Sequence, residues 1–304
     1  MSFSNFKKRI KRFIKEKCRF IHIDYNYEEL DYVSSPNVCY VIRRKDKIGL
    51  FSFFITNLGA IKFLKDKGCN ICISDLEEIE WNSFFLLKEP YKKTNNTKFI
   101  EFDSAVSYRP NDSVDNLTNV RFMKYWHDFF YRNVCFEPKI SEYLNKQYEL
   151  YLGGKEDSTI GVICRGTDYI TLKPFMHPRQ PKAEDLYDRI DILLNENKYK
   201  NIYLVTEDIE IYEKFKEKYK EKVISVPQDR ISLKDKKSLF DVVKENKMDT
   251  YDRNLDYLTS IFLLSKCRAL VGGRSSGTVA AMVLSEGFSD IYLWNQGRYG
   301  DEFE

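Results

Sequence analysis

Short apolar runs alternate with longer amphipathic segments through the C-terminal half of the chain. The apolar runs have the length of buried β-strands and lie at 159–164, 202–206, 223–226, 269–272 and 290–294. The segments between them have the apolar spacing of helices and cover 183–195, 209–219, 255–266 and 277–286. This alternation predicts a parallel sheet with helices on both faces.

The N-terminal half shows the same alternation with longer interruptions. Residues 38–55 have the apolar pattern of strands around the charged turn Arg43–Lys47, and a helical pattern follows up to Leu64. A further strand is expected at 69–74, so this half also has a β-α-β order. Residues 120–150 are expected to be helical, with an aromatic stripe of the kind that more often forms a core than a binding face.

A polar, glycine-containing turn at Gly153–Asp157 marks the expected boundary between the two halves. For 304 residues, two domains of ordinary size fit better than one. We therefore expect two Rossmann-like domains, one at 1–152 and one at 153–304. Two doubly wound α/β domains that face each other across a cleft form the GT-B architecture, which is the predicted fold class.

Positive charge is concentrated at the N-terminus. The whole chain has a net charge of only +3, which argues against a nucleic-acid-binding protein that is basic throughout. Residues 1–19 hold eight Lys or Arg and one acid, so the remainder has a net charge of −4. Residues 1–17 place apolar side chains on one helical face and basic ones on the other. This pattern is typical of a helix on an anionic membrane surface, and equally of a helix packed on its own domain; RNA binding is a weaker third reading.

The cysteine pattern favours a reducing compartment. The seven cysteines are scattered and odd in number, so we expect a cytoplasmic protein without a disulfide framework. Cys69 and Cys72 form the one C-x-x-C pair and are expected to be buried or half-buried thiols of a strand rather than metal ligands. No apolar run approaches the roughly 18 residues of a membrane span, so membrane contact is expected to be peripheral, at the inner face of the cytoplasmic membrane.

Polar residues follow three of the expected C-terminal strands. They are Arg165, Gly166, Thr167 and Asp168 after the first strand, Thr206, Glu207 and Asp208 after the second, and Arg274, Ser275, Ser276 and Gly277 after the fourth. Because the carboxyl ends of parallel strands meet at one edge of a sheet, these residues are expected to line one crevice. An arginine there is suited to hold a phosphate, and a Ser-Ser-Gly turn before a helix offers it N–H groups and hydroxyls.

Each of these features also has a purely structural explanation. Arg165 can form a salt bridge with Asp168 or Glu207, and the serine turn can be a helix cap. His177 lies in a proline-rich loop that can be a rigid surface turn. Taken singly, structure explains His177 and Arg274 better, whereas the shared crevice favours a functional role for Arg165.

At these positions the chain resembles the fucosyltransferase clan of GT-B enzymes, most nearly its α1,6-fucosyltransferases. The first motif of that family, H-x-R-R-T-D with His-Pro nine residues after the Asp, is similar to Arg165, Thr167, Asp168, His177 and Pro178. Its second motif, Y-L-A-T-D-D, is similar to Tyr203–Asp208, and its third resembles Leu270–Gly277. In order and spacing the resemblance covers about residues 159–285.

The resemblance implies roles for these residues. Arg165 would bind the β-phosphate of a nucleotide-sugar donor and stabilise the leaving nucleotide. The other residues after the three strands, together with His177, would bind the rest of the donor. The domain at 153–304 would then be the nucleotide-sugar-binding domain, and the one at 1–152 the acceptor-side domain.

Four positions differ from the family pattern. The leading His is Ile163 here, the second Arg is Gly166, and the Asp that reads guanine falls at Ser260, with Asp256 nearby as a substitute. The acid proposed as the family's catalytic base falls at Lys173, which leaves Asp168 as the nearest carboxylate.

These observations predict a bacterial, inverting, metal-independent glycosyltransferase with no cofactor beyond its nucleotide-sugar substrate. GDP-fucose is the first candidate donor, and the acceptor would be a glycan hydroxyl, on a lipid-linked chain, in capsule or lipopolysaccharide synthesis. No D-x-D sequence of metal-dependent transferases occurs. Two other classes stay open: a non-catalytic nucleotide- or glycan-binding protein, and a different nucleotide-dependent enzyme on the same fold.

Overall fold

The structure is a computed structural model that describes residues 32, 34–44, 48–74, 81–104, 109–110, 112–196, 198–232 and 250–300. The basic segment 1–17 lies outside them. By its contacts the chain forms two compact units, and each is described by itself. The smaller unit takes the chain up to residue 47 together with 56–74 and 90–109, and the larger takes the rest. The domain boundary expected at 152/153 stays a prediction; by contacts, residues 110–152 group with the larger unit.

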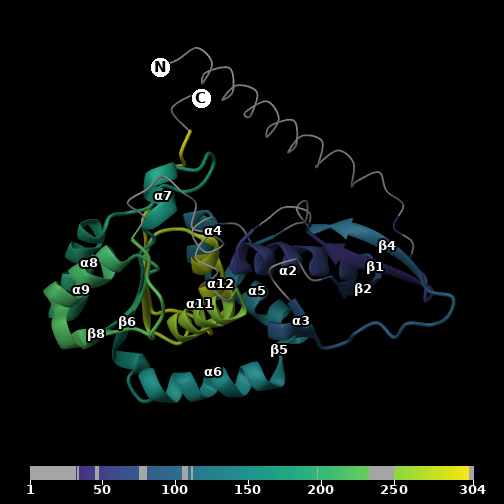
Figure 1. Ribbon diagram of the computed structural model, residues 1–304, viewed down its shortest axis with the longest axis horizontal. Coiled ribbons are helices and arrows are strands. Elements are labelled where there is room, and N and C mark those ends of the chain that lie inside the picture. The colour runs from purple at the N-terminus through teal and green to yellow at the C-terminus, as the bar shows by residue number, and fades with distance from the viewer. Residues whose placement is uncertain are drawn as a thin grey trace, which may run out of the picture. The chain divides into compact units, whose positions relative to one another are not determined.

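The smaller unit is built on a three-stranded parallel sheet (Figure 1). The strand order is β2 (Asn70–Ile73), β1 (Val38–Arg43), β4 (Lys98–Asp103). Phe63 belongs to helix α2 (Leu50–Asp66), which follows β1 in the sequence, and stacks on Phe102 of β4 with ring centroids 5.7 Å apart. Cys69, just before β2, is buried, and Cys72 in β2 is half-buried, as the sequence predicts.

The strand expected at 48–55 is wrong, because helix α2 (Leu50–Asp66) begins there. An apolar run of this length suits a buried strand and a buried helix equally well. Buried side chains occur on successive positions of α2, including Phe53, Phe54 and Ile55, so no polar stripe marks the helical period.

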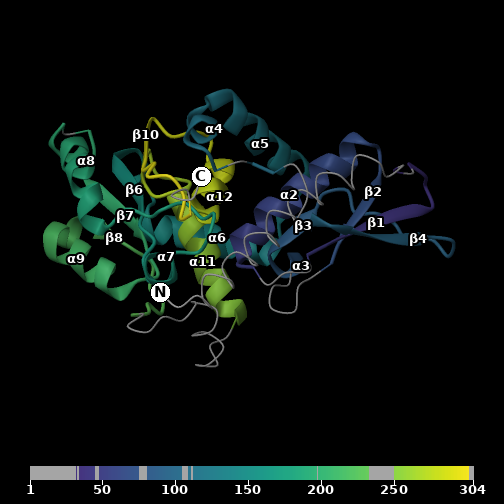
Figure 2. The same cartoon turned by 90° about the horizontal axis from the view of Figure 1, so that it is seen from above.

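The larger unit contains a five-stranded parallel sheet, as the alternating pattern predicts. The order is β10 (Asp290–Leu293), β9 (Ala269–Gly272), β6 (Thr159–Ile163), β7 (Asn201–Val205), β8 (Val223–Ile224). Helices α8 (Ala183–Asn195) and α9 (Ile209–Tyr219) share one apolar core with β6, β7 and β9. Helices α11 (Thr250–Leu264) and α12 (Ser276–Leu284) cover the opposite face (Figures 1 and 2).

The strand order creates a switch point beside β6. The chain runs from β6 through β7 to β8 and then returns to β9 on the other side of β6. In open α/β sheets, ligands bind outside the carboxyl ends of the strands at such a reversal. The residues that follow β6 and β9 are therefore the first place to look for a site.

The region expected to be helical at 120–150 is divided. Helix α5 (Val120–Asn133) ends at the short strand β5 (Val134–Phe136), which pairs antiparallel with β3 (Phe85–Leu87). Helix α6 (Pro138–Tyr151) then begins with Pro138 in its first turn and Glu137 as its N-cap. The remaining elements are short: α3 (Trp81–Phe84), α4 (Val114–Thr118), α7 (Thr167–Leu172), η2 (Glu156–Ser158) and η3 (Lys220–Lys222).

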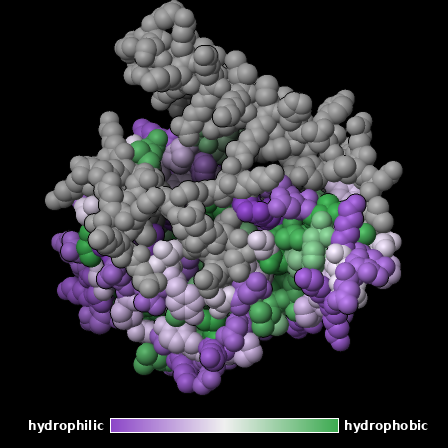
Figure 3. Space-filling view, turned by 45° about the vertical axis from the view of Figure 1, so that its right-hand side comes forward, coloured by the Kyte–Doolittle hydropathy of each residue, from purple (hydrophilic) through white to green (hydrophobic). Residues whose placement is uncertain are grey.

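On the face seen in Figure 3, hydrophilic side chains are interspersed with smaller apolar areas. Among the described residues, no helix has the length and apolarity needed to cross a bilayer.

Candidate functional site

Arg165 leaves the carboxyl end of β6 and is held by Glu207. The guanidinium Nε donates to Glu207 Oε1 at 3.1 Å, and the backbone N–H of Gly166 donates to the same oxygen at 3.2 Å. The two side chains are 16% and 20% exposed, so this ion pair is largely shielded from solvent. One of the salt bridges considered from the sequence therefore exists, and it lies at the predicted strand edge.

Two tyrosines also lie next to the Arg165 guanidinium. Its central carbon lies 4.5 Å from the ring centroid of Tyr169, a cation–π contact. The hydroxyl of Tyr257, on α11, lies beside the Arg165 guanidinium. Burial raises the pKa of Tyr257 to about 12, although Arg165 lowers it in part, so this phenol is protonated at neutral pH. Sequence reasoning missed both tyrosines.

His177 contacts Tyr169, and so belongs to the surroundings of the Arg165 side chain. Its ring meets the Tyr169 ring edge-on, with centroids 5.5 Å apart. Its Nδ1 lies 3.0 Å from the carbonyl oxygen of Phe175, and the side chain is exposed. The structure thus brings His177 into the neighbourhood of Arg165 without a direct contact between them in the described interactions.

The second strand end is engaged in local structure. The Thr206 hydroxyl accepts from the N–H of Asp208 at 3.2 Å, and the Thr206 carbonyl accepts from the Gln228 amide at 2.8 Å. The Asp208 carboxylate caps α9 by accepting from the N–H groups of Glu210 and Ile211 at 2.9 and 3.1 Å.

Gly166, which follows β6, lies directly against Asp208, which follows β7. A Cβ on Gly166 would overlap the Asp208 carboxylate, so the second arginine of the family pattern has no room here unless Asp208 moves.

The third strand end begins α12. Ser275 is its N-cap, buried, and accepts from the N–H of Thr278 at 3.2 Å. Ser276 is half-buried at the first helical position. A Cβ added to Gly277 would lie 2.5 Å from the Tyr257 hydroxyl oxygen, so this hydroxyl rests against the backbone of the first turn. Through Tyr257, Arg165 and the N-terminus of α12 are neighbours.

Arg274 serves the packing around this turn. It is 5% exposed, and its terminal nitrogens lie 3.4 Å from the carbonyl oxygens of Asp112 and Gly297. Its own carbonyl accepts from the Gln180 amide at 2.7 Å. These contacts agree with the structural explanation for Arg274.

The candidate base-reading positions face inward. Ser260 is buried and donates to the Asp256 carbonyl at 2.9 Å, with Gln228 Oε1 3.5 Å away. Ile163 is buried in β6. Asp256 is half-buried, and burial raises the pKa of its carboxyl, with a further contribution from Asp252 and Asp229.

Thr167, Asp168 and Lys173 make none of the contacts described above. Helix α7 begins at Thr167, but the side chains of Thr167 and Asp168 are not among those that the structure describes, so their roles stay predictions. Lys173 is exposed and ends α7 with a φ of 47°, a left-handed conformation. Over the described residues, no three or more His, Cys, Asp or Glu side chains group to hold a metal ion, and metal independence stays a prediction.

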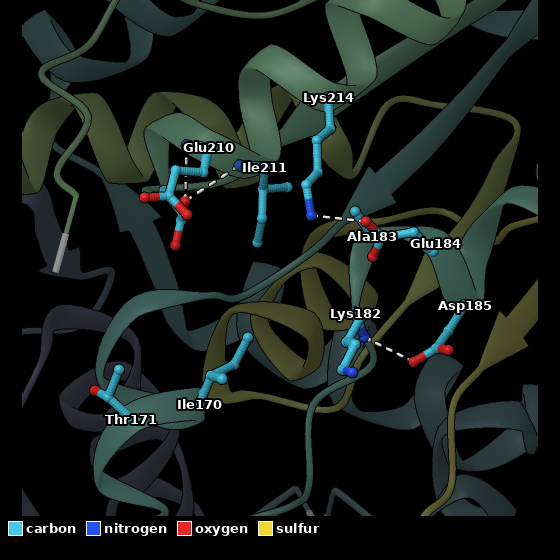
Figure 4. A pocket seen from close by; sticks show the side chains of 10 residues that line it. Ile170, Thr171, Lys182, Ala183, Glu184, Asp185, Glu210, Ile211 and Lys214 are labelled. Carbon is cyan, nitrogen blue, oxygen red and sulfur yellow. Dashed lines mark hydrogen bonds and ion pairs between the residues drawn. The ribbon is translucent and has the colours of Figure 1, made fainter. Parts of the chain in front are cut away.

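A recess of about 600 Å³ adjoins the second strand end (Figure 4). The beginnings of α8 and α9 and the end of α7 line it, with residues Ile170, Thr171, Lys182, Ala183, Glu184, Asp185, Asp208, Glu210, Ile211 and Lys214. Four carboxylates there face two lysines, and Lys214 already pairs with Glu184 at 2.6 Å. This excess of negative charge disfavours a diphosphate in the recess.

Comparison with known proteins bears on the fold. No family model matches the chain, and no curated protein sequence matches it significantly. A mutant of Arabidopsis thaliana FUT1 in complex with GDP is similar over 91% of this chain and 74% of that chain, with 11% identity and a TM-score of 0.51. The chain has the fold of FUT1. The predicted α/β fold class of GT-B type, and the resemblance to fucosyltransferases at the level of fold, are confirmed.

Two further solved structures are similar at lower scores. Fucosyltransferase NodZ from Bradyrhizobium matches over 87% of this chain and 96% of that chain, with 15% identity and a TM-score of 0.48. POFUT1 in complex with GDP matches over 88% and 100%, with 10% identity and a TM-score of 0.43.

Proposed function

We propose that this protein is a glycosyltransferase that moves a sugar from a nucleoside diphosphate to a hydroxyl of a glycan. One observation carries the proposal. The Tyr257 hydroxyl contacts both the Arg165 guanidinium and the first turn of α12, so a cation and a helix N-terminus lie together at the switch point. Each of these groups attracts phosphate, and together they suit a diphosphate.

The chemistry follows from that pair. The acceptor oxygen attacks the anomeric carbon of the donor, a new C–O bond forms, and the bond from that carbon to the β-phosphate oxygen breaks. Negative charge then develops on the leaving diphosphate, where Arg165 and the N–H groups of α12 stabilise it without a metal ion. Attack from the face opposite the diphosphate inverts the anomeric centre. The acceptor proton goes to a carboxylate, for which we propose Asp168.

The FUT1 structure holds GDP, so we take GDP as the first nucleotide to test and GDP-fucose as the first donor. Ser260 and Ile163 offer no guanine contact in their present positions, and Asp256 is the group we propose for the base. The acceptor would be a lipid-linked glycan of capsule or lipopolysaccharide synthesis, reached from the cytoplasmic face.

The first experiment is a thermal-shift screen of GDP, UDP, CDP, ADP and dTDP in the presence of EDTA. A rise in melting temperature with GDP supports the fucosyl donor, and a rise with another nucleotide keeps a glycosyltransferase but rejects fucose. A shift with none of them contradicts the proposal.

The role of Arg165 is tested in a transfer assay with the matching nucleotide sugar. Arg165→Ala should lower turnover about 10²-fold or more, the scale of losing an electrostatic stabiliser of the transition state. The control is Arg43→Ala, which removes an exposed Arg–Glu pair with a distance of 2.9 Å in the smaller unit and should leave turnover unchanged. Nucleotide binding without any transfer in the wild type would favour a binding protein instead.

A further inference from the structure

Tyr257 lies where three segments far apart in the sequence meet. It belongs to α11, its hydroxyl lies beside the Arg165 guanidinium after β6, and the same hydroxyl rests on Gly277 in the first turn of α12. Its ring packs edge-on against Phe51 with centroids 4.8 Å apart. The ring is therefore held from behind while the hydroxyl contacts both anion-binding features.

Glu207, Tyr169 and Tyr257 approach Arg165 from different directions. Glu207 holds Nε, the Tyr169 ring covers a face of the guanidinium, and Tyr257 binds from the α12 side. The Tyr257 hydroxyl also lies against Gly277 in the first turn of α12, so it stands between the guanidinium and that turn.

We propose that Tyr257 is a positioning residue that keeps Arg165 at a fixed distance from the N-terminus of α12, so that both reach the same diphosphate. This inference rests on the proposed function, which supplies the diphosphate. It adds a residue that no motif of the chain indicates. Rigid placement of charged groups before the reaction is what makes electrostatic stabilisation effective, so a loosened Arg165 should bind and stabilise a diphosphate less well.

The test compares Tyr257→Phe with the wild type. The phenylalanine keeps the ring against Phe51 and removes only the hydroxyl. We expect the Kd of the nucleoside diphosphate found in the screen, measured by titration calorimetry, to rise about tenfold, the scale of losing one hydrogen bond to a charged group. The kcat/KM for transfer should fall by a similar factor.

A matched control separates positioning from general stability. Tyr219→Phe also removes a hydroxyl with one bond, to Asp191 at 2.9 Å, from a helix on the other face of the sheet. It should lower the melting temperature as much as Tyr257→Phe does and leave both Kd and kcat/KM unchanged.

Gly277→Ala provides a second, independent variant. Its new Cβ would lie 2.5 Å from the Tyr257 oxygen but 3.1 and 3.4 Å from Ile261 and Ile163 carbons, so the hydroxyl is the main group displaced. Gly277→Ala should therefore weaken nucleotide binding in the wild type and add little in the Tyr257→Phe background. Fully additive losses would overturn the proposal.

The outcomes distinguish this inference from the proposed function. If Arg165→Ala abolishes binding and Tyr257→Phe leaves Kd unchanged, positioning by Tyr257 is wrong and the function stands. If the wild type transfers no sugar but the Kd values change as expected, the transferase is rejected and the positioning of the anion site is supported.

Discussion

Glu207 shows how one side chain can join two segments of a site. Its Oε1 accepts both the Arg165 Nε and the Gly166 N–H, so it orients the side chain of one residue and the backbone of the next. A salt bridge of this kind was one of the structural explanations for Arg165. The structural and functional explanations are compatible, because a shielded carboxylate that fixes the arginine also prepares it for a ligand.

The residues around Arg165 separate what local sequence can reveal from what it cannot. Glu207, Ser275 and Gly277 were predictable because they follow strands whose ends must meet in a parallel sheet. Tyr169 lies four residues after Arg165, a spacing that brings side chains together on a helix, but no helix was expected at the position of α7. Tyr257 had no signal, because its contact depends on how α11 packs beside α12.

Asp256 leads to a prediction about pH. Burial raises the pKa of its carboxyl in the folded protein, followed by the effect of Asp252 and Asp229. A carboxyl whose pKa is higher in the folded state than in the unfolded state stabilises the fold while it is protonated. This stabilisation is complete below the unfolded pKa and is lost as the pH rises through the folded pKa. Asp256→Asn should therefore melt at a higher temperature than the wild type at pH 7, and the gain should vanish toward about pH 4.

Calorimetric melting at several pH values measures this difference. Asp157→Asn is the control, because the Asp157 side chain is 88% exposed and its replacement should leave the melting temperature unchanged. A lower melting temperature for Asp256→Asn at pH 7 would contradict this expectation. It would show that the Asp256 carboxylate stabilises the fold through an interaction that outweighs the cost of its burial.

At the scale of elements, helix α9 leads to a prediction about its cap. Asp208→Ala removes the acceptor for two N–H groups and should cost about 1 kcal/mol of unfolding free energy. That cost corresponds to about 2–4 °C in melting temperature for a unit of this size. Asp208→Asn keeps an acceptor oxygen and should melt close to the wild type. Equal losses in both variants would mean that the charge, rather than the cap, supports α9.

Elements with clear ends were predicted accurately. Helices at 183–195 and 209–219 have the expected bounds, and Asp208 supplies a cap at the start of the second. The strand at 269–272 also has its expected bounds. Helix α2 was not recognised over its first turns because it is apolar on too many sides. The break after Asn133 was missed because β5 has only three residues and is stabilised by its partner β3.

At the scale of the whole molecule, positive charge is distributed unevenly along the chain. Residues 1–19 carry a strongly positive charge while the rest of the chain has a net charge of −4. We propose that residues 1–17 bind the anionic surface of the membrane. Their structure is outside the described residues, so this prediction rests on composition and spacing alone.

Deletion of residues 1–17 should lower binding to vesicles that contain anionic phospholipid by about tenfold or more, since each basic residue near such a surface contributes about 1 kcal/mol. Sedimentation with the vesicles measures the change, and vesicles of neutral phosphatidylcholine are the control. Unchanged binding to anionic vesicles after the deletion would remove the membrane proposal.

The position of β9 beside β6 affects how the protein is made. These strands pair residue by residue, with Ile160 opposite Ala269, although β7, β8 and the helices α7, α8, α9 and α11 lie between them in the sequence. During synthesis, β6 can pair with β7 long before β9 leaves the ribosome. Until then one side of β6 presents unpaired, apolar backbone that can recruit another chain. A chain that stops before residue 269 should therefore aggregate rather than persist as a smaller folded protein.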